Sequence, residues 1–600
     1  MSTSGKYEVH NQPVEVILGW LKGGEIAIPE IQRPFVWDAS KVRDLLDSLY
    51  QGYPVGYLIA WQNPGVRLKD GKDPYGKKVL IDGQQRVTAL AAAMLGWQIV
   101  TDDYRKTRIR ISFNPQTERF EVYNPAIEKD NAWIPDVSEI YSNDNSLFPL
   151  IEAYTSQNSG ITREQIYPAL EKLLSIRAKQ IGLIELAHDL DIDTVTDIFI
   201  RINSKGVNLS QADFAMSKIA SSEEYGGVTL RKAIDYFCHM SIDPAFHATV
   251  SDVDSEFTKT EYFKLMDWLK KENDDTYDPD YSDLLRVIII SKFGRGRLAD
   301  LVSLLSGRNF ETRTFEAPIA EAAFKILDEG IKDFINETNF KRFIMIIRSA
   351  GFIDSSFIRS QNVLNFAYAL YLSLRDMGVE AGKIERIVRR WFVMSLITSR
   401  YTGSPETAFD TDIRRVKEIG PEKMLEEAEA MLKSDVFWDV TIASGLETSS
   451  TSSPYWGVFL ASQIKNKDMG FLSRDITVED LVSHKGDIHH IFPKDFLKKN
   501  GLSKGKYNQI ANYVYMQTEI NIKVGNKAPK EYFAQVLKQC SGSSIKIGSI
   551  DDELMLNKNL VMNCVPESVV SMSFGDYETF LSERRLLMAH KMKDYYLKAL

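Results

Sequence analysis

Apolar residues follow two different periods over the first hundred positions of the chain. A helix is predicted after Asp38, which is a suitable N-cap, because apolar residues recur there at helical spacing. The apolar face of that helix is formed by Val42, Leu45, Leu46 and Leu49. Continuous apolar runs at 55–61 and 79–81 predict two buried strands, and an Ala-rich helix over 87–95 follows the second one. The N-terminal region is therefore expected to be an α/β domain.

Helical spacing dominates from about residue 255 to residue 400. Apolar residues recur at three-to-four spacing over 319–335, directly after Pro318, and again over 363–374. Such stripes are typical of core packing rather than of a site. A Ser/Thr-rich run over 447–454 then predicts a loop or hinge before the last part of the chain.

The length of 600 residues exceeds what one hydrophobic core supports, so several domains are expected. We predict an α+β multidomain protein with an α/β domain over 1–250, a helical linker region over 251–400 and a helical domain over 401–600. The composition, 44% hydrophobic and 26% charged, is that of a folded soluble protein. A net charge of −9 argues against a protein that coats nucleic acid through bulk charge, but it leaves room for a local basic surface.

The three cysteines, Cys238, Cys540 and Cys564, are odd in number and far apart. They form neither a zinc knuckle nor a disulfide framework, which favours a reducing compartment. The first residues lack the apolar segment of a signal peptide, and the longest apolar runs are too short to span a bilayer. We therefore expect a cytoplasmic protein without a membrane partner.

Histidines cluster near residue 490. Three of the eight, His484, His489 and His490, fall within seven residues, and Asn512 and Asn521 follow nine residues apart. Phosphodiester hydrolysis needs a metal to neutralise the phosphate and a base to activate water, and imidazole titrates near neutrality. Neighbouring histidines on a strand face opposite sides, so a twist there would let one hold metal while the other faces the phosphate. The alternative is that these histidines are surface or core residues without a ligand.

The string Asp-Ile-His-His-Ile-Phe-Pro over 487–493, with two asparagines downstream, resembles the ββα-metal fold of HNH endonucleases. The resemblance implies a core at about 480–530 in which His490 is the general base and His489 and Asn521 are the metal ligands. It implies that Asn512 braces the loop and orients the base. A His/Asn pair leaves the metal charge uncompensated by the protein, so substrate phosphate and water must complete the shell. Mg²⁺ or Mn²⁺ is expected first, and because Mg²⁺ prefers hard oxygen ligands, Ni²⁺ or Zn²⁺ would also serve.

Local charge supports contact with nucleic acid. Between residues 484 and 530 there are nine lysines and three acidic residues, a local excess of +6 in a chain of net charge −9. Such an excess fits contact with the phosphate backbone. Lys523 and Lys527 lie just beyond Asn521, and we predict that they bind DNA.

A second candidate site is the string Asp82-Gly83-Gln84-Gln85-Arg86, between a predicted strand and a predicted helix. Glycine at such a turn lets backbone N–H groups approach a ligand closely, and the helix N-terminus adds positive potential. The Arg86 guanidinium adds a bidentate phosphate donor, so the turn suits a triphosphate although no Walker sequence is present. Asp82 could hold a nucleotide-bound Mg²⁺ or accept hydrogen bonds from the turn.

Two further strings, Ile28 to Trp37 and Phe199 to Ser210, flank this motif. In this order the three strings resemble the ParB-like N-terminal domain of GmrSD-type, modification-dependent (type IV) restriction endonucleases. Phosphorothioate-sensing defence nucleases share this domain. The resemblance implies NTP binding and hydrolysis at the turn, with Arg33 and Arg201 near the phosphates. It also implies that the N-terminal half senses modified DNA and gates an HNH nuclease. The alternative for Arg33 and Arg201 is a buried ion pair that stabilises the fold.

We therefore expect a nucleotide-regulated, modification-dependent endonuclease of anti-phage defence that acts on double-stranded DNA. One alternative is a nucleotide-switched DNA-binding regulator with a vestigial nuclease fold, and another is a toxin-like RNase. The sequence does not distinguish the modification or the NTP. The oligomeric state stays open, and a homo-oligomer is one option because ParB-like modules often dimerise.

Overall fold

The computed structural model describes residues 6–27, 37–62, 78–100, 106–142, 147–187, 190, 210–271, 276–484 and 486–600. The chain divides into two compact units, Met1–Arg231 and Lys232–Leu600. Most of the two strings around Ile28 to Trp37 and Phe199 to Ser210 lies outside the described residues, and so do Arg33, Arg201 and Lys485. The molecule is largely helical with small sheets, which fits the predicted α+β class.

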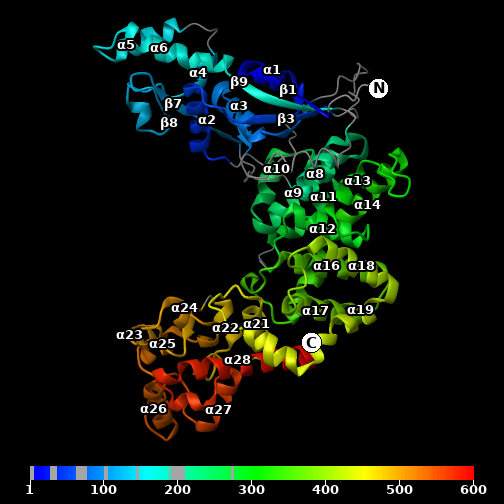
Figure 1. The fold of residues 1–600 in the computed structure, drawn as a ribbon, viewed down its shortest axis with the longest axis vertical. Helices are drawn as coiled ribbons and strands as arrows, with labels where there is room; N and C mark the ends of the chain where they lie inside the picture. The colour runs from blue at the N-terminus through cyan, green and yellow to red at the C-terminus, as the bar shows by residue number, and fades with distance from the viewer. Residues whose placement is uncertain are drawn as a thin grey trace. The chain divides into compact units, whose positions relative to one another are not determined.

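The first unit contains a five-stranded mixed sheet in the order β1-β9-β3-β4-β2 (Figure 1). Its strands are β1 (Tyr7–Pro13), β2 (Ile26–Ala27), β3 (Tyr57–Gln62), β4 (Lys78–Asp82) and β9 (Gln180–Leu186). The β1–β9 and β3–β4 pairs are antiparallel, whereas β3–β9 and β2–β4 are parallel. The strands predicted at 55–61 and 79–81 are confirmed as β3 and β4.

Three helices share one buried core with this sheet: α1 (Val14–Gly23), α2 (Ala39–Gln51) and α3 (Gln84–Leu95). The Asp38 side chain accepts a hydrogen bond from the Lys41 amide and caps α2, as predicted. Small alanines let α3 be buried on most of its faces, from Val87 to Met94. The helix expected over 87–95 thus begins earlier, directly at the end of β4.

The remaining elements of the first unit are two hairpins and short helices. They are β5 (Gln98–Val100), β6 (Lys106–Arg108), β7 (Ile111–Asn114), β8 (Arg119–Val122), α4 (Ser138–Ser142), α5 (Phe148–Gln157), α6 (Arg163–Leu174) and α8 (Gln211–Ser221). The strands β5 and β6, and likewise β7 and β8, pair antiparallel.

The second unit is helical over its first half. Its helices there are α9 (Gly227–Ile242), which begins just before the unit boundary, α10 (Phe246–Val253), α11 (Glu261–Leu265), α12 (Tyr281–Ser291), α13 (Leu298–Leu305), α14 (Ala317–Ile335), α15 (Glu337–Ser349), α16 (Gln361–Asp376), α17 (Ala381–Ile397), α18 (Pro405–Ile419) and α19 (Pro421–Ala428). The helices expected over 319–335 and 363–374 are confirmed as α14 and α16. Every residue of α16 from Val363 to Leu374 is buried, so this helix is surrounded by its neighbours.

The second half of this unit carries shorter elements around a small hairpin. They are α20 (Ala443–Gly445), α21 (Pro454–Lys465), α22 (Val478–Ser483), β10 (Ile488–His490), α23 (Lys494–Lys499), α24 (Lys504–Tyr507), β11 (Tyr513–Tyr515), α25 (Thr518–Val524), α26 (Pro529–Cys540), α27 (Glu553–Met562) and α28 (Tyr577–Asp594). No helix among the described residues is both long and apolar enough to cross a bilayer.

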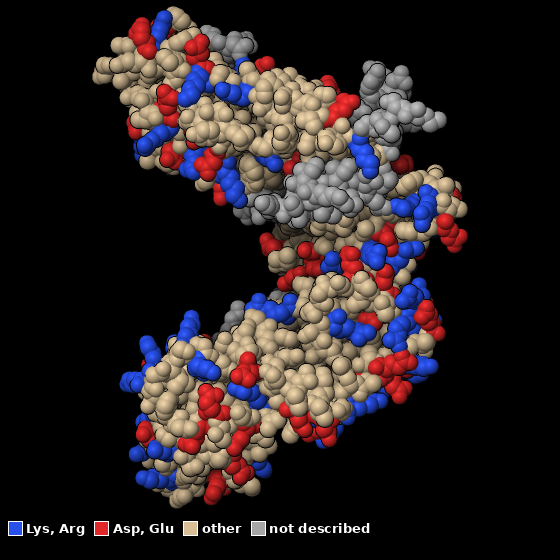
Figure 2. Space-filling view, in the orientation of Figure 1, with Lys and Arg blue, Asp and Glu red and all other residues tan. Residues whose placement is uncertain are grey.

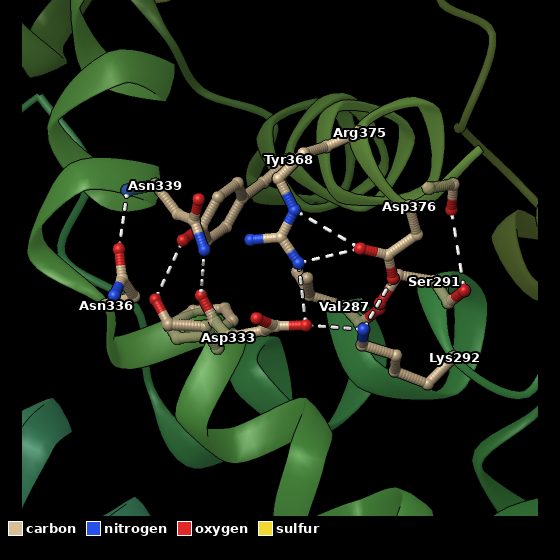
Figure 3. Close-up of polar contacts among 11 residues, drawn as sticks. Val287, Ser291, Lys292, Asp333, Asn336, Asn339, Tyr368, Arg375 and Asp376 are labelled. Carbon is tan, nitrogen blue, oxygen red and sulfur yellow. Dashed lines mark hydrogen bonds and ion pairs between the residues drawn. The ribbon is translucent and has the colours of Figure 1, made fainter. Parts of the chain in front are cut away.

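Four charged side chains join α12, α14 and α16 (Figure 3). The Lys292 ammonium, at the end of α12, contacts the carboxylates of Asp333 and Asp376. The Arg375 guanidinium lies 2.7 Å from the same two carboxylates. Two cations and two anions therefore neutralise one another where three helices meet, and each carboxylate has two partners.

Replacing Lys292 by methionine is expected to lower the free energy of unfolding by about 1–3 kcal/mol, because both carboxylates then depend on Arg375 alone. Partial exposure of Asp376 favours the lower end of that range. Urea unfolding of the parent and the variant measures the difference. Lys259→Met is the matched control, since Lys259 pairs with the exposed Glu256, and it should change little.

The loss should depend on pH. Burial raises the pKa of Asp376, but its hydrogen bonds with Lys292 and Arg375 outweigh burial and lower it below 3.8. Burial likewise lowers the pKa of Lys292, but the two carboxylates raise it above 10.5. The Asp376 contribution is thus lost as the pH falls through its lowered pKa, and that of Lys292 as the pH rises through its raised one. A difference between parent and variant that grew in acid would contradict these contributions.

Candidate active site

His489, His490 and Asn521 lie on three elements that follow one another, two strands and a helix. The strands β10 and β11 pair antiparallel, with His489 opposite Val514 and His490 opposite Tyr513. The helix α25 begins three residues after β11 and carries Asn521. Figure 1 shows this region at one end of the C-terminal unit, beside α23 and α24. The spacing of the motif is therefore realised as two strands followed by a helix.

His489 offers a buried nitrogen lone pair. Its Nε2 atom is buried and has no hydrogen-bond partner within the described part of the chain. Burial lowers the pKa of His489, against an opposing effect of Asp487, so the ring is neutral at pH 7. A neutral imidazole with an unpartnered buried nitrogen fits a metal ligand, because leaving such an atom unsatisfied is otherwise costly.

Asn521 is the second candidate ligand. Its side chain is half-buried on α25, and its backbone carbonyl accepts the Gly525 amide. Among the described residues, no three His, Cys, Asp or Glu side chains converge in a way that could hold a metal ion. A cation at His489 and Asn521 would thus have one imidazole and one carboxamide from the protein, and water or phosphate oxygens would complete its shell.

His490 is held by a different partner. Its Nε2 atom lies 3.0 Å from Oδ1 of Asn508, and its ring packs edge-on against Tyr513 with centroids 5.0 Å apart. Burial lowers the pKa of His490; Lys494 and His489 lower it further, and the Asn508 hydrogen bond opposes them. The ring is therefore neutral near pH 7 and has one nitrogen available to accept a proton.

Asn512 is fully buried and braces the turn that follows β10. Its Oδ1 accepts the Phe492 amide at 2.8 Å, and its Nδ2 donates to the Phe492 carbonyl at 3.0 Å and to the Tyr507 carbonyl at 3.4 Å. Its backbone carbonyl also accepts the Ile491 amide. One carboxamide therefore fixes the loop on both sides, while the side chain that accepts a hydrogen bond from the His490 ring is Asn508.

Side chains from the following helices satisfy the carbonyl groups of this loop. Arg584 of α28 is fully buried and donates to the carbonyls of Ala511 and Tyr513, each at 2.8 Å, and to Asn563 at 3.2 Å. Burial lowers the pKa of Arg584 to about 10, so it stays charged at neutral pH. The hydroxyls of Tyr532 and Tyr577 donate to Ile491 and to Lys506 and Tyr507, respectively. The loop is thus clamped by α26 and α28.

Exposed lysines line the helices beside the hairpin. We call this set the lysine face: Lys494, Lys498, Lys499, Lys504, Lys506 and Lys523. Within the described ranges none of them forms an ion pair, and Figure 2 shows Lys and Arg gathered on this edge of the C-terminal unit. Lys527 differs, because its ammonium donates to the carbonyls of Lys523 and Val524 at the end of α25. Lys527 therefore caps a helix, whereas Lys523 is free to meet a phosphate.

The predicted N-terminal turn has the expected strand-to-helix geometry. Gly83 caps α3 with φ +90°, and an added Cβ would lie 2.2 Å from the Leu58 side chain, so a larger residue would strain the backbone and displace Leu58. Gln84 is buried and donates to the Leu80 carbonyl at 2.6 Å, while Gln85 is half-buried at the start of α3. The turn therefore presents glycine and the first amides of α3 together.

Asp82 and Arg86 contact each other across this turn. Arg86 Nη2 lies 3.3 Å from the Asp82 carboxylate, and its Nη1 donates to the Tyr57 carbonyl on β3. Both side chains are about one quarter exposed. Arg86 thus ties α3 to β3 and keeps donors in reserve, because a guanidinium has five N–H groups.

Sequence reasoning missed three groups of this site: Asn508, Arg584 and the tyrosines of α26 and α28. The motif spacing marks only residues that recur in the resemblance, and Asn508 sits between its positions. Arg584 follows the loop it clamps by more than 70 residues. A charged residue in an otherwise apolar helical stripe was the one signal in the sequence for Arg584.

Arg584→Met is expected to lower the free energy of unfolding by at least about 3 kcal/mol, because three buried carbonyls lose their donor at once. Guanidinium unfolding of the full chain measures the loss. Lys558→Met on α27 is the control, since Lys558 is exposed and should stay within about 0.5 kcal/mol of the parent. Equal stability of Arg584→Met and the parent would show that the clamp is dispensable.

Comparison with known proteins bears on both units. Residues 17–220 match the family model of the GmrSD restriction endonuclease, N-terminal domain. The chain is also similar to an uncharacterized protein of Methanocaldococcus jannaschii, with 22% identity over 559 residues that cover 86% of this chain and 85% of that relative. The likeness therefore extends well beyond the N-terminal sheet. Residues 17–220 are therefore similar to the N-terminal domain of GmrSD-type restriction endonucleases.

Proposed function

We propose that this protein is a metal-dependent endonuclease that cuts double-stranded DNA at the β10–β11–α25 element. The observation that carries the proposal is the pair of histidines on β10 with their different surroundings. Nε2 of His489 is buried without a partner among the described residues, and His490 is held by a hydrogen bond at its own Nε2. The GmrSD-type match of the N-terminal region supports DNA as the substrate.

In the proposed reaction the chain supplies a base and a fixed scaffold. The neutral His490 ring takes a proton from a water molecule, the resulting hydroxide attacks phosphorus, and the bond from phosphorus to the leaving oxygen breaks. A divalent cation bound by His489 and Asn521, Mg²⁺ or Mn²⁺ first and Ni²⁺ or Zn²⁺ as alternatives, would neutralise the phosphate and stabilise the leaving oxygen. Asn512 holds the backbone directly after β10, the strand that carries both histidines.

The lysine face gives the DNA backbone a place to bind. Lysines that contact DNA phosphates release the counterions that are condensed on the DNA. This release is the main source of sequence-independent affinity. Lys494 begins α23 and is near enough to His490 to lower its pKa, so a cation stands beside the proposed base. A phosphate drawn to Lys494 would therefore meet the water that His490 activates.

The N-terminal unit is proposed to bind an NTP at the Asp82–Arg86 turn and to gate cleavage in response to DNA modification, as in anti-phage defence. Support comes from the glycine that opens the start of α3, from the N–H groups of Arg86 that have no partner among the described residues, and from the family match. Asp82, Gly83, Gln84 and Gln85 form that turn. Arg33 and Arg201 are proposed to join the phosphates, although they lie outside the described residues.

His490→Ala should lower the rate of plasmid cleavage by about 10²–10⁴-fold and leave DNA binding intact, because only the proton acceptor is lost. Nicking assays with Mg²⁺ or Mn²⁺ measure the rate, and EDTA should abolish cleavage by the parent. His484→Ala is the matched control. His484 is exposed, is six residues away and contacts the Asp480 carbonyl, so its loss should not slow cleavage. Parental rates for His490→Ala would refute the assignment of the base.

Arg86→Ala should reduce phosphate release from the hydrolysed NTP by at least about 10-fold, because a bidentate phosphate donor is removed. Circular dichroism must accompany the assay, since Arg86 also ties α3 to β3. Arg43→Ala in the same unit is the control, because Arg43 pairs with Asp44 and Glu121 on the surface. A folded Arg86→Ala protein with parental turnover would refute nucleotide hydrolysis at this turn, and so would a parent without turnover of any NTP.

A further inference from the structure

We infer that Asn508 is the positioning residue of His490 and selects the ring nitrogen that takes the proton. Asn508 accepts the N–H of Nε2, which leaves the lone pair of His490 on Nδ1. The inference rests on the proposed function, because it assigns a role to the group that orients the proposed base.

The contact is built from two parts of the loop. Asn508 directly follows α24, its amide donates to the Lys504 carbonyl at 3.2 Å, and its side chain is half-buried. The Tyr577 hydroxyl donates to the carbonyls of Lys506 and Tyr507, the two residues before Asn508, at 3.1 and 3.2 Å. The His490 ring is fixed independently by the β10–β11 pairing and by the edge of Tyr513. The 3.0 Å contact therefore joins two side chains whose backbones are each held in place.

The chemistry of the two partners sets the direction of the hydrogen bond. A neutral imidazole has one N–H and one lone pair, and a carboxamide oxygen only accepts. A contact between Nε2 and Oδ1 thus requires the proton on Nε2 and leaves Nδ1 as the base. When Nδ1 takes a proton from water, the ring becomes an imidazolium with N–H groups at both nitrogens. Asn508 then still accepts from Nε2 and stabilises the positive charge.

The other asparagine of the loop is not available for this task. The Asn512 carboxamide is committed to the backbone of Phe492 and Tyr507 through three hydrogen bonds. The two asparagines therefore divide the work: Asn512 fixes the loop, and Asn508 fixes the tautomer of the base. A carboxamide with its amide group toward Nε2 would impose the opposite tautomer, so aspartate at position 508 discriminates between the two arrangements.

The test compares Asn508→Leu with Asn508→Asp in the full-length protein. Leucine should lower kcat for DNA cleavage by about 10- to 100-fold at an unchanged KM for DNA and an unchanged affinity for Mn²⁺, because the base is misoriented while the ligands stay. Aspartate keeps the acceptor and has no donor, so it should restore most of the lost rate. Asn500→Leu is the control, since Asn500 is exposed on the same loop and its side chain donates to the Phe496 carbonyl. Parental kcat for Asn508→Leu would overturn the inference, and so would an Asn508→Asp protein as slow as the leucine variant.

A second readout does not depend on cleavage. Solid-state NMR of the full chain labelled with ¹³C,¹⁵N-histidine distinguishes the two neutral tautomers, and His490→Gln assigns the signal. The parent should show His490 with its proton on Nε2, and Asn508→Leu should show a mixture. A proton on Nδ1 in the parent would overturn the inference whatever the activity. If the parent cleaves DNA with none of the divalent cations, the proposed function is wrong. If the parent cleaves DNA and Asn508→Leu cleaves it equally fast, only the inference about Asn508 is wrong.

Discussion

The hairpin of β10 and β11 depends on one buried carboxamide, that of Asn512. The Asn512 side chain accepts a hydrogen bond from the backbone amide of Phe492 and donates one to its carbonyl, as a paired strand would. Phe492 follows the end of β10, and Asn512 precedes the start of β11. Without it, an amide and a carbonyl would be buried without partners, at a cost of about 1–3 kcal/mol each. Asn512 therefore fixes the turn after the strand that carries both histidines, and the clamp from α26 and α28 holds the rest of the loop.

Much of the site's framework could be predicted from the sequence, because it depends on local order along the chain. The resemblance of the string around His489 and His490, with its two downstream asparagines, to HNH endonucleases implied two strands and a helix, and β10, β11 and α25 are present at those places. Apolar periodicity also predicted α2, α14 and α16. These features leave a trace within a few residues, where burial and backbone geometry repeat.

The hydrogen bonds between side chains and the backbone of distant segments could not be predicted from the sequence. Arg584, Tyr532 and Tyr577 each donate to carbonyl groups of a loop that precedes them by many residues, and such pairs have no period. Pairing of β1 with β9 is missed for the same reason, since 7–13 and 180–186 are remote in the chain. Lys527 was expected to bind DNA because of its charge and its place beyond Asn521, and the contact of its ammonium with carbonyls at the end of α25 left no trace in the sequence. Charge counts predict where a basic surface lies and not which cation is free.

The position of Arg584 also sets the order in which the protein can mature on the ribosome. The loop between β10 and β11 is synthesised before α28. Its carbonyl groups therefore lack the Arg584 guanidinium until α28, the last of the elements that contact the loop, has been synthesised. During translation the two histidines are therefore made well before the helix that immobilises their surroundings. A nascent chain of this kind carries both histidines before the contacts that fix the loop beside them can form.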